Sequence, residues 1–303
     1  MTPSIVLLGN LLVDDVVLAD GTTRMAQAGG ALLYGALAAT LWNARPGLVS
    51  VLGTDYPVDV LQMLRQRHVD LAGLHALGHP GVRTWLLYEG TIRRMIHRVG
   101  CPTHEDVSPQ PRMIPSEWNG APAFHLAPMP FDVQRTLVAS LSGVVGRFVS
   151  VDPLLPVTAE TLHEWREVLA NVDAFFPGED ELLLDGVQTN PPLALSRLAK
   201  GRLRFIVFKR GAKGGTLYDA HDRRSYDWTT RADVVVDETG AGDAFSSAFV
   251  LAHLEGHPIE ACLQRAVVTA SFALAGWGPE ALLAATRSDA DARWRSWYAA
   301  GIH

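Results

Sequence analysis

Short apolar runs rich in β-branched residues alternate along the chain with longer stretches whose apolar positions recur every three or four residues. The short runs predict buried strands at residues 5–8, 48–51, 123–126, 148–151, 174–176, 205–208 and 234–236. The longer stretches predict helices that include residues 32–42, 58–67, 132–141, 158–169, 193–198 and 244–254. Strands and helices in this alternation predict an α/β fold, a three-layer α/β/α domain around a mainly parallel central sheet.

Residues 15–28 and 82–100 depart from this alternation because each segment has the pattern of a pair of strands. In the second segment, residues 89–91 are typical of the start of a hairpin turn. We therefore expect one domain over residues 1–303 that carries a small β-sheet lid, since such flaps often cover a site. The exposed edge of the lid could pair with a second copy of the chain, so a homodimer through the lid is left open.

Composition narrows the class of protein. Hydrophobic residues make up 48% of the chain and charged residues 19%, which allows a sizeable core and excludes disorder. The formal net charge of −6 argues against a dedicated nucleic-acid binder. Two cysteines, Cys101 and Cys262, are too few for a disulfide framework and favour a reducing compartment. Because no apolar run is long enough to span a bilayer, we expect a cytoplasmic protein without a nucleic-acid or membrane partner.

A glycine-rich turn near the C-terminus carries the most specific chemistry. Gly240 and Gly242 follow a β-branched run and precede an apolar-periodic helix, so the backbone can turn tightly and approach a ligand. Free amides at a helix start, together with the helix dipole, make an anion hole suited to phosphate. Asp243 would repel a phosphate, but in a phosphoryl transferase it could take the proton of the acceptor hydroxyl. The alternative is that Asp243 only caps the helix.

Three motifs together resemble those of one enzyme family. The stretch DETGAGDAF at residues 237–245 resembles the C-terminal signature of the ribokinase-like (PfkB) carbohydrate and nucleoside kinases. The stretch LGNLLVD at residues 8–14 resembles that family's first strand and substrate-binding aspartate, and GGALLY at residues 29–34 resembles its di-glycine motif. The resemblance covers nearly the whole chain and implies a ribokinase-like kinase domain that uses ATP and Mg²⁺, while a need for K⁺ is left open.

The resemblance implies roles for the signature residues. Asp243 takes the place of the family's catalytic base. The anion hole would consist of the amides of Gly240, Ala241 and Gly242. Asp237 and Thr239 match positions near a monovalent cation site of several family members. Residues 270–277 would line the adenine pocket.

On the acceptor side, the resemblance makes Asp14 the substrate-binding aspartate, and a carboxylate suits two hydroxyls of a polyol. The neighbouring Asp15 could compete for this role. Gly29 and Gly30 would bring the backbone close to the sugar. Tyr34 stands where the family commonly has Asn, so an aromatic face would replace a polar contact and help set specificity. The alternative is that Tyr34 only packs its helix against the sheet.

On the nucleotide side, residues 207–215 resemble the strand and glycine turn that lie against the ATP phosphates. Gly211 and Gly214 would permit close approach of the backbone, and Lys209 could neutralise phosphate charge. The alternative for Lys209 and its neighbour Arg210 is a solvated pair at the end of a strand.

The metal-organising Asn-x-x-Glu motif of the family is only half present. Glu181 matches its Glu and would organise Mg²⁺ through water, whereas Gly178 replaces its Asn and has no side-chain oxygen. Since Mg²⁺ keeps several waters and needs few protein ligands, we expect this change to weaken metal organisation without abolishing it.

These assignments predict an ATP-dependent kinase that transfers the γ-phosphoryl group to a hydroxyl of a sugar, sugar acid or nucleoside. The basic side chains of the lid are typical of a solvated face, or would draw an acidic sugar beneath it. The alternative function is a catalytically weak sugar- or nucleotide-binding sensor, which Gly178 and Tyr34 favour and the intact Asp243 motif opposes. A dinucleotide-dependent oxidoreductase is disfavoured because no G-x-G-x-x-G follows the first strand.

Overall fold

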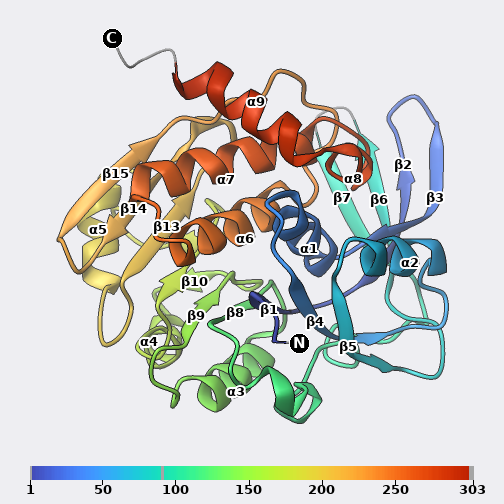
Figure 1. The fold of residues 1–303 in the computed structure, drawn as a ribbon, viewed down its shortest axis with the longest axis horizontal. Helices are drawn as coiled ribbons and strands as arrows, with labels where there is room; N and C mark the ends of the chain where they lie inside the picture. Colours follow the sequence, from blue (N-terminus) through green and yellow to red (C-terminus); the bar gives the residue numbers. More distant parts are fainter. Residues whose placement is uncertain (1, 90–91, 300–303) are drawn as a thin grey trace.

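The computed structural model describes residues 2–89 and 92–299. Within these residues, the main sheet has nine strands in the order β15-β14-β13-β11-β9-β8-β1-β4-β5 (Figure 1). The strands from β13 to β5 pair in parallel, whereas β14 and β15 join one edge antiparallel. Their bounds are β1 Ile5–Leu8, β4 Pro46–Leu52, β5 Asp70–Ala76, β8 Ala123–Leu126, β9 Phe148–Val151, β11 Ala174–Phe175, β13 Phe205–Lys209, β14 Gly215–Asp219 and β15 Arg224–Trp228.

Helices cover both faces of this sheet, which confirms the three-layer α/β/α fold (Figure 1). One layer contains α1 Ala31–Leu41, α2 Val58–Gln66, α6 Ala241–Leu254, α7 Ile259–Leu274, α8 Glu280–Ala284 and α9 Arg287–Tyr298. The other contains α3 Phe131–Leu141, α4 Leu162–Leu169 and α5 Pro191–Leu198. Short 3₁₀ turns occur at Pro111–Met113, Ser116–Trp118 and Gly211–Lys213. In β1, Ile5 packs into the first layer and Val6 into the second, which is why this strand is apolar throughout.

A second sheet, which we call the small sheet, is built from the two predicted strand pairs. In the described part of the chain it has the order β3-β2-β6-β7, with bounds β2 Leu12–Val17, β3 Thr23–Gly29, β6 Arg83–Glu89 and β7 Ile92–His97. Figure 1 shows it beside α1 and α8, at one end of the main sheet. Asp14 of β2 lies opposite Thr84 of β6, which in turn lies opposite His97 of β7, so these residues share one face of the small sheet. A two-stranded sheet joins β10 Val157–Thr158 to β12 Leu182–Leu183.

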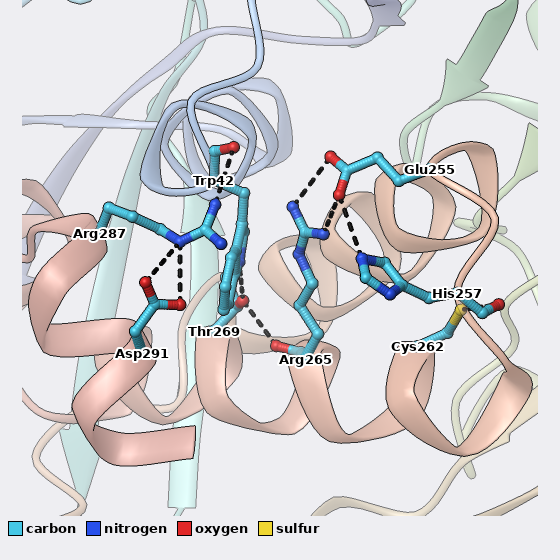
Figure 2. Close-up of polar contacts among 8 residues, drawn as sticks. All are labelled: Trp42, Glu255, His257, Cys262, Arg265, Thr269, Arg287 and Asp291. Carbon is cyan, nitrogen blue, oxygen red and sulfur yellow. Dashed lines mark hydrogen bonds and ion pairs between the residues drawn. The ribbon is translucent and has the colours of Figure 1, made fainter. Parts of the chain in front are cut away.

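An aromatic ring held between two cations joins the helices of the first layer (Figure 2). The Trp42 ring, just after α1, lies 4.1 Å from the Arg265 guanidinium of α7 and 4.7 Å from that of Arg287 in α9. Its indole Nε1 donates a hydrogen bond to Thr269 Oγ1 at 2.8 Å, and Arg265 forms an ion pair with Glu255. Cation–π contacts of this kind stabilise by about 0.5–2 kcal/mol each. They fix the C-terminal end of α1 against α7 and α9.

Three predictions of local structure need correction. Residues 234–236 form no strand: Val234 and Val235 are 55% and 58% exposed, and the backbone amide of Val236 donates to the Leu274 carbonyl. The predicted helix at 158–169 begins only at Leu162, because Thr158 belongs to β10. The helix predicted from residue 244 begins three residues earlier, at Ala241.

The described residues include no helix that is both long and apolar enough to cross a membrane.

Candidate active site

The candidate site lies at the carboxyl ends of three neighbouring parallel strands, where α/β proteins commonly bind ligands. Asp152 directly follows β9, Gly178 lies three residues after the end of β11, and Lys209 ends β13. Gly178 and Lys209 are bridged in parallel, and the Lys209 amide donates to the Pro177 carbonyl at 2.9 Å. This edge of the sheet faces the start of α6, because Ser246 of that helix reaches both Asp152 and Lys209.

The signature turn is fixed by a glycine that no other residue could replace without strain. Gly240 caps α6 in the left-handed region with φ 74°, and a Cβ there would lie 2.1 Å from Tyr34 Cγ. Ala241, Gly242 and Asp243 therefore form the first helical turn. Amides in a first turn have no acceptor within the helix, and the helix dipole adds positive potential there. The structure thus places the three predicted anion-hole residues and Asp243 at one helix N-terminus.

The surroundings of Asp243 favour the protonated form of its carboxyl. Burial, together with repulsion from Asp152, raises the pKa of its carboxyl to about 7, although the positive charge of Lys209 acts in the opposite direction. A general base works best when its pKa lies near the pH of the reaction. A carboxyl that served only as a helix cap would be expected to have a lowered pKa, because the amides it accepts from favour its charged form.

Lys209 does not extend into solvent. Its ammonium donates to both carboxylate oxygens of Asp152, at 2.9 and 2.7 Å, and contacts Ser246 Oγ at 3.4 Å. Ser246 Oγ also donates to Asp152 Oδ2 at 2.7 Å. Burial alone would lower the pKa of Lys209, but Asp152 and Glu181 raise it, so the ammonium stays charged. Lys209 is therefore anchored beneath the first turn of α6, and a Cβ at Gly242 would lie 3.4 Å from its Nζ.

Asp152 is the residue of the site that the sequence analysis missed. Its side chain is 1% exposed and connects β13 to α6 through Lys209 and Ser246. A usable signal was present, because Asp152 directly follows the buried strand predicted at residues 148–151. Polar residues in that position reach the ligand-binding edge of a parallel sheet.

Glu181 is oriented by the backbone of the residue that replaces the family's Asn. The Gly178 amide donates to Glu181 Oε2 at 2.7 Å. Burial and the negative charge of Asp152 raise the pKa of the Glu181 carboxyl to about 7, against the effect of Lys209.

The donor chemistry of this cluster fits magnesium. Asp152 pairs with the Lys209 ammonium, and the carboxyls of Glu181 and Asp243 are near enough to influence its pKa, so three carboxyls accompany one cation. Mg²⁺ prefers oxygen donors of this kind. In the described residues, no three His, Cys, Asp or Glu side chains come close enough to hold an ion among them. A Mg²⁺ ion here would therefore keep waters or phosphate oxygens among its ligands.

On the acceptor side, Asp14 lies against the di-glycine motif. A Cβ at Gly29 would lie 1.9 Å from Asp14 Oδ2, so the close approach requires glycine. Asp15 is committed to the small sheet, because it forms an ion pair with Arg83 at 2.6 Å and accepts from the Ala26 amide at 2.8 Å. Asp14 is therefore the better candidate for binding an acceptor.

Tyr34 lies between the acceptor aspartate and the signature turn. Its side chain is 2% exposed and its ring packs against Gly240. Burial and the nearby carboxylates of Asp237, Asp14 and Asp243 raise the pKa of its hydroxyl well above the ordinary value. Tyr34 thus packs against the signature turn, and its role in acceptor specificity stays a prediction.

The two glycines predicted to contact ATP differ in their surroundings. Gly211 has positive φ and no atom within 4 Å of where its Cβ would lie. At Gly214 a Cβ would lie 2.0 Å from the Trp228 carbonyl oxygen, so this glycine allows β14 to pack against β15. Trp228 in turn stacks on Phe245 of α6, with ring centroids 5.4 Å apart. A ligand could therefore approach the backbone at Gly211. At Gly214, the close packing of the Trp228 backbone is sufficient to explain why the residue is glycine.

Asp237 is held by hydrogen bonds from separate parts of the chain. Its Oδ1 accepts from the Thr239 amide at 3.0 Å, from Thr239 Oγ1 at 2.7 Å and from the Tyr88 hydroxyl at 2.7 Å. Its Oδ2 accepts from the Gly278 amide at 3.0 Å.

Two surface hollows of the described residues lie near the amino ends of the main-sheet strands, away from the candidate site at their carboxyl ends. One, of about 450 Å³, is lined by residues 142–148 with Asp173 and Arg202. The other, of about 610 Å³, is lined by residues that include Thr2, Arg45 and Asp70. They contain none of the predicted site residues.

A carboxylate base candidate at a helix N-terminus, beside an acidic cluster suited to magnesium, is the arrangement of an α/β phosphotransferase. Comparison with known proteins agrees with this class. The model of the pfkB family of carbohydrate kinases matches residues 142–283. The cytidine kinase of Thermococcus kodakarensis is 30% identical over 281 residues, which are 90% of this chain and 97% of that protein.

Solved structures show the same fold. The Arabidopsis thaliana ribokinase with ribose and ATP superposes with a TM-score of 0.78, at 20% identity over 97% of this chain and 99% of that one. A structure assigned to a ribokinase II of E. coli, with ATP and Mg²⁺, has a TM-score of 0.76 at 18% identity, over 96% and 98%. The chain belongs to the PfkB family and has the ribokinase fold. It is an ATP-dependent carbohydrate or nucleoside kinase.

Proposed function

We propose that the protein transfers the γ-phosphoryl group of ATP to a hydroxyl of a nucleoside, with Asp243 as the general base. The observation that supports this most is the packing of Tyr34 of α1 against Gly240 at the start of α6, while Asp14 lies against Gly29, just before α1. An acceptor held by Asp14 would therefore lie close to the base and to the first turn of α6. A nucleoside is favoured as acceptor because similarity to the cytidine kinase extends over 97% of that enzyme.

The chemical step follows from these positions. Asp14 would accept hydrogen bonds from two hydroxyls of the acceptor sugar. Asp243 would take the proton of the acceptor hydroxyl while the oxygen of that hydroxyl bonds to the γ-phosphorus of ATP. The bond from the γ-phosphorus to the oxygen that bridges it to the β-phosphorus breaks, and ADP is released. The amides of the first turn of α6 would stabilise the negative charge on the transferring group.

Magnesium, when bound with ATP, would neutralise charge on the phosphate oxygens. Glu181 is the residue that would hold a water of that ion, since the Gly178 amide fixes one of its carboxylate oxygens. The backbone amide of Gly178 thus supplies part of the orientation that an Asn side chain would otherwise give. This supports an active kinase over the alternative of a catalytically weak sensor.

We further propose that the small sheet is a lid over the acceptor. Asp14 is itself a residue of β2, and Thr84 and His97 share its face. An acceptor bound to Asp14 would therefore contact the small sheet directly. Closure would exclude water, which could otherwise attack ATP.

The test is a panel of acceptors with ATP and Mg²⁺. Purified protein is incubated with each ribonucleoside, with deoxycytidine, and with ribose, fructose and gluconate. ADP release is measured against a reaction without acceptor, and mass spectrometry identifies the phosphorylated product. We expect acceptor-dependent ADP release with a nucleoside, cytidine being the first to try. Turnover of sugars alone would contradict the nucleoside assignment, and nucleotide binding without any turnover would favour the sensor.

A further inference from the structure

The Asp237 carboxylate accepts hydrogen bonds on both oxygens where a monovalent cation would have to bind. Its side chain is buried, with the residue 3% exposed. A carboxylate offers about four acceptor positions. Among the described residues, Oδ1 receives three hydrogen bonds and Oδ2 one. The lone pairs of Oδ1 are thus already directed at protons.

These surroundings do not fit a cation on this carboxylate. A K⁺ ion would need oxygens around it, but the Gly278 amide points its hydrogen at Oδ2 and Thr239 points two hydrogens at Oδ1. An amide hydrogen carries partial positive charge and repels a cation. The predicted cation role of Asp237 and Thr239 therefore disagrees with the hydrogen bonds that they make. The hydroxyl proton of Tyr88 supplies positive charge to Oδ1 in place of an ion.

Tyr88 belongs to the small sheet, whereas Asp237 begins the signature turn. The Tyr88 ring also packs edge-on against Trp277, with centroids 5.8 Å apart. A second link joins Arg24 of β3 to Glu280 of α8 at 2.6 Å, but these side chains are 36% and 53% exposed. Exposed pairs contribute little. The Tyr88–Asp237 hydrogen bond, to a buried carboxylate, is therefore the stronger connection between the small sheet and the signature turn.

The same strand also faces the acceptor side. Thr84 of β6 lies opposite Asp14, and Tyr88 follows four residues later on the same face of the small sheet. A shift of β6 on acceptor binding would move both positions together. At the other end, Asp237 holds Thr239, the residue before the helix-capping Gly240.

From this geometry we propose that Tyr88 is a positioning residue, which replaces a monovalent cation at Asp237 and couples closure of the small sheet to the phosphate-binding turn. The coupling rests on the proposed function, because it presumes an acceptor at Asp14 and phosphate at the turn. The replacement of the cation does not depend on it. Two predictions follow: the enzyme does not require K⁺, and loss of the Tyr88 hydroxyl reduces transfer more than it reduces binding of ATP.

The first experiment tests the cation in the unmodified protein. Melting temperature without ligands, and kcat with an identified acceptor, are measured in KCl, NaCl and tetramethylammonium chloride at equal ionic strength. We expect the same melting temperature within 1 °C and the same kcat within about twofold in all three salts. The proposal would be overturned if K⁺ alone raised the melting temperature by several degrees, or if K⁺ alone raised kcat severalfold.

The second experiment uses Tyr88→Phe, which keeps the ring on Trp277 and removes the hydroxyl. Tyr226→Phe in β15 is the matched control. We expect Tyr88→Phe to lower kcat about tenfold, with the KM for ATP within twofold. The fraction of ATP hydrolysed by water should rise, because the phosphate-binding turn would then act on ATP whether or not the small sheet is closed. A merely structural role would lower the melting temperature and leave this fraction unchanged.

The outcomes separate this proposal from the proposed function. If no acceptor in the panel is phosphorylated, the proposed function fails, while the melting temperatures in the three salts still test the cation replacement. If Tyr88→Phe does not fold, the salt comparison in the unmodified protein decides the cation claim, and Tyr88→Trp tests the coupling with a ring that cannot place a hydroxyl on Asp237. Transfer by either folded variant at the unmodified rate would overturn the coupling.

Discussion

Replacing Asp243 by Asn should make the unliganded protein more stable at pH 8. Burial and the charge of Asp152 raise the pKa of this carboxyl from 3.8 to about 7 in the folded protein. Below pH 4 the group is protonated in both states, so it contributes no difference. Between about pH 4 and 7 the folded state holds a proton that the unfolded state has lost, so this group's contribution to stability falls as pH rises.

The magnitude can be worked from this shift. About three pKa units at 1.4 kcal/mol each would give roughly 4 kcal/mol above pH 7. Asp243 is only half-buried, so solvent screens part of the effect and we expect about 1–2 kcal/mol. Asn is neutral at every pH and removes this penalty. At pH 5 the difference should be less than half as large, because pH 5 lies only about one unit above the unfolded pKa of 3.8.

Urea unfolding at pH 5 and pH 8, without nucleotide or Mg²⁺, measures the effect. Glu238→Gln is the control, since Glu238 lies in the same turn with an exposed side chain. We expect Asp243→Asn to raise the unfolding free energy clearly more at pH 8 than at pH 5, and Glu238→Gln to change it at neither pH. A variant that is equally or less stable than the unmodified protein at pH 8 would refute the reasoning about burial and charge.

Two further predictions concern the metal and the acceptor. Glu181→Gln should lower kcat and move the Mg²⁺ dependence to higher concentration, because a carboxylate that would hold a metal-bound water is lost; an unchanged Mg²⁺ titration would contradict the assignment. Tyr34→Ala should raise the KM for the acceptor much more than that for ATP, and should also cost about 3–5 kcal/mol of stability, since it opens a cavity beside Gly240. Equal, small changes in the two KM values would leave Tyr34 with its packing role alone.

The central strands could be predicted from the sequence because they are buried on both faces. Ile5 and Val6 pack into opposite layers, and a run of such residues has few alternatives to a central strand. Edge strands gave no such signal: β5 and β15 are mostly exposed or half-buried, and neither has a continuous run of large apolar residues. The run at 234–236 has high β propensity, but its backbone finds no partner strand.

The site could be predicted only where a local motif carries it. The signature placed Asp243 and the glycines at a helix start, because the turn and the helix are consecutive in sequence. The partner of Lys209 could not be found in this way, since Asp152 lies 57 residues earlier and meets it only through the parallel sheet. The Tyr88–Asp237 contact, 149 residues apart, depends likewise on how the small sheet docks.

The most direct test of the account is single-turnover phosphoryl transfer by Asp243→Asn, measured with ATP affinity for both proteins. A general base contributes typically about 10²–10⁴-fold, so transfer should slow by that factor, or roughly 3–5 kcal/mol. ATP should bind as tightly as before or more tightly, because a negative charge near the phosphate site has been removed. Transfer within a few-fold of the unmodified rate would contradict the assignment and leave the signature as a nucleotide-binding turn.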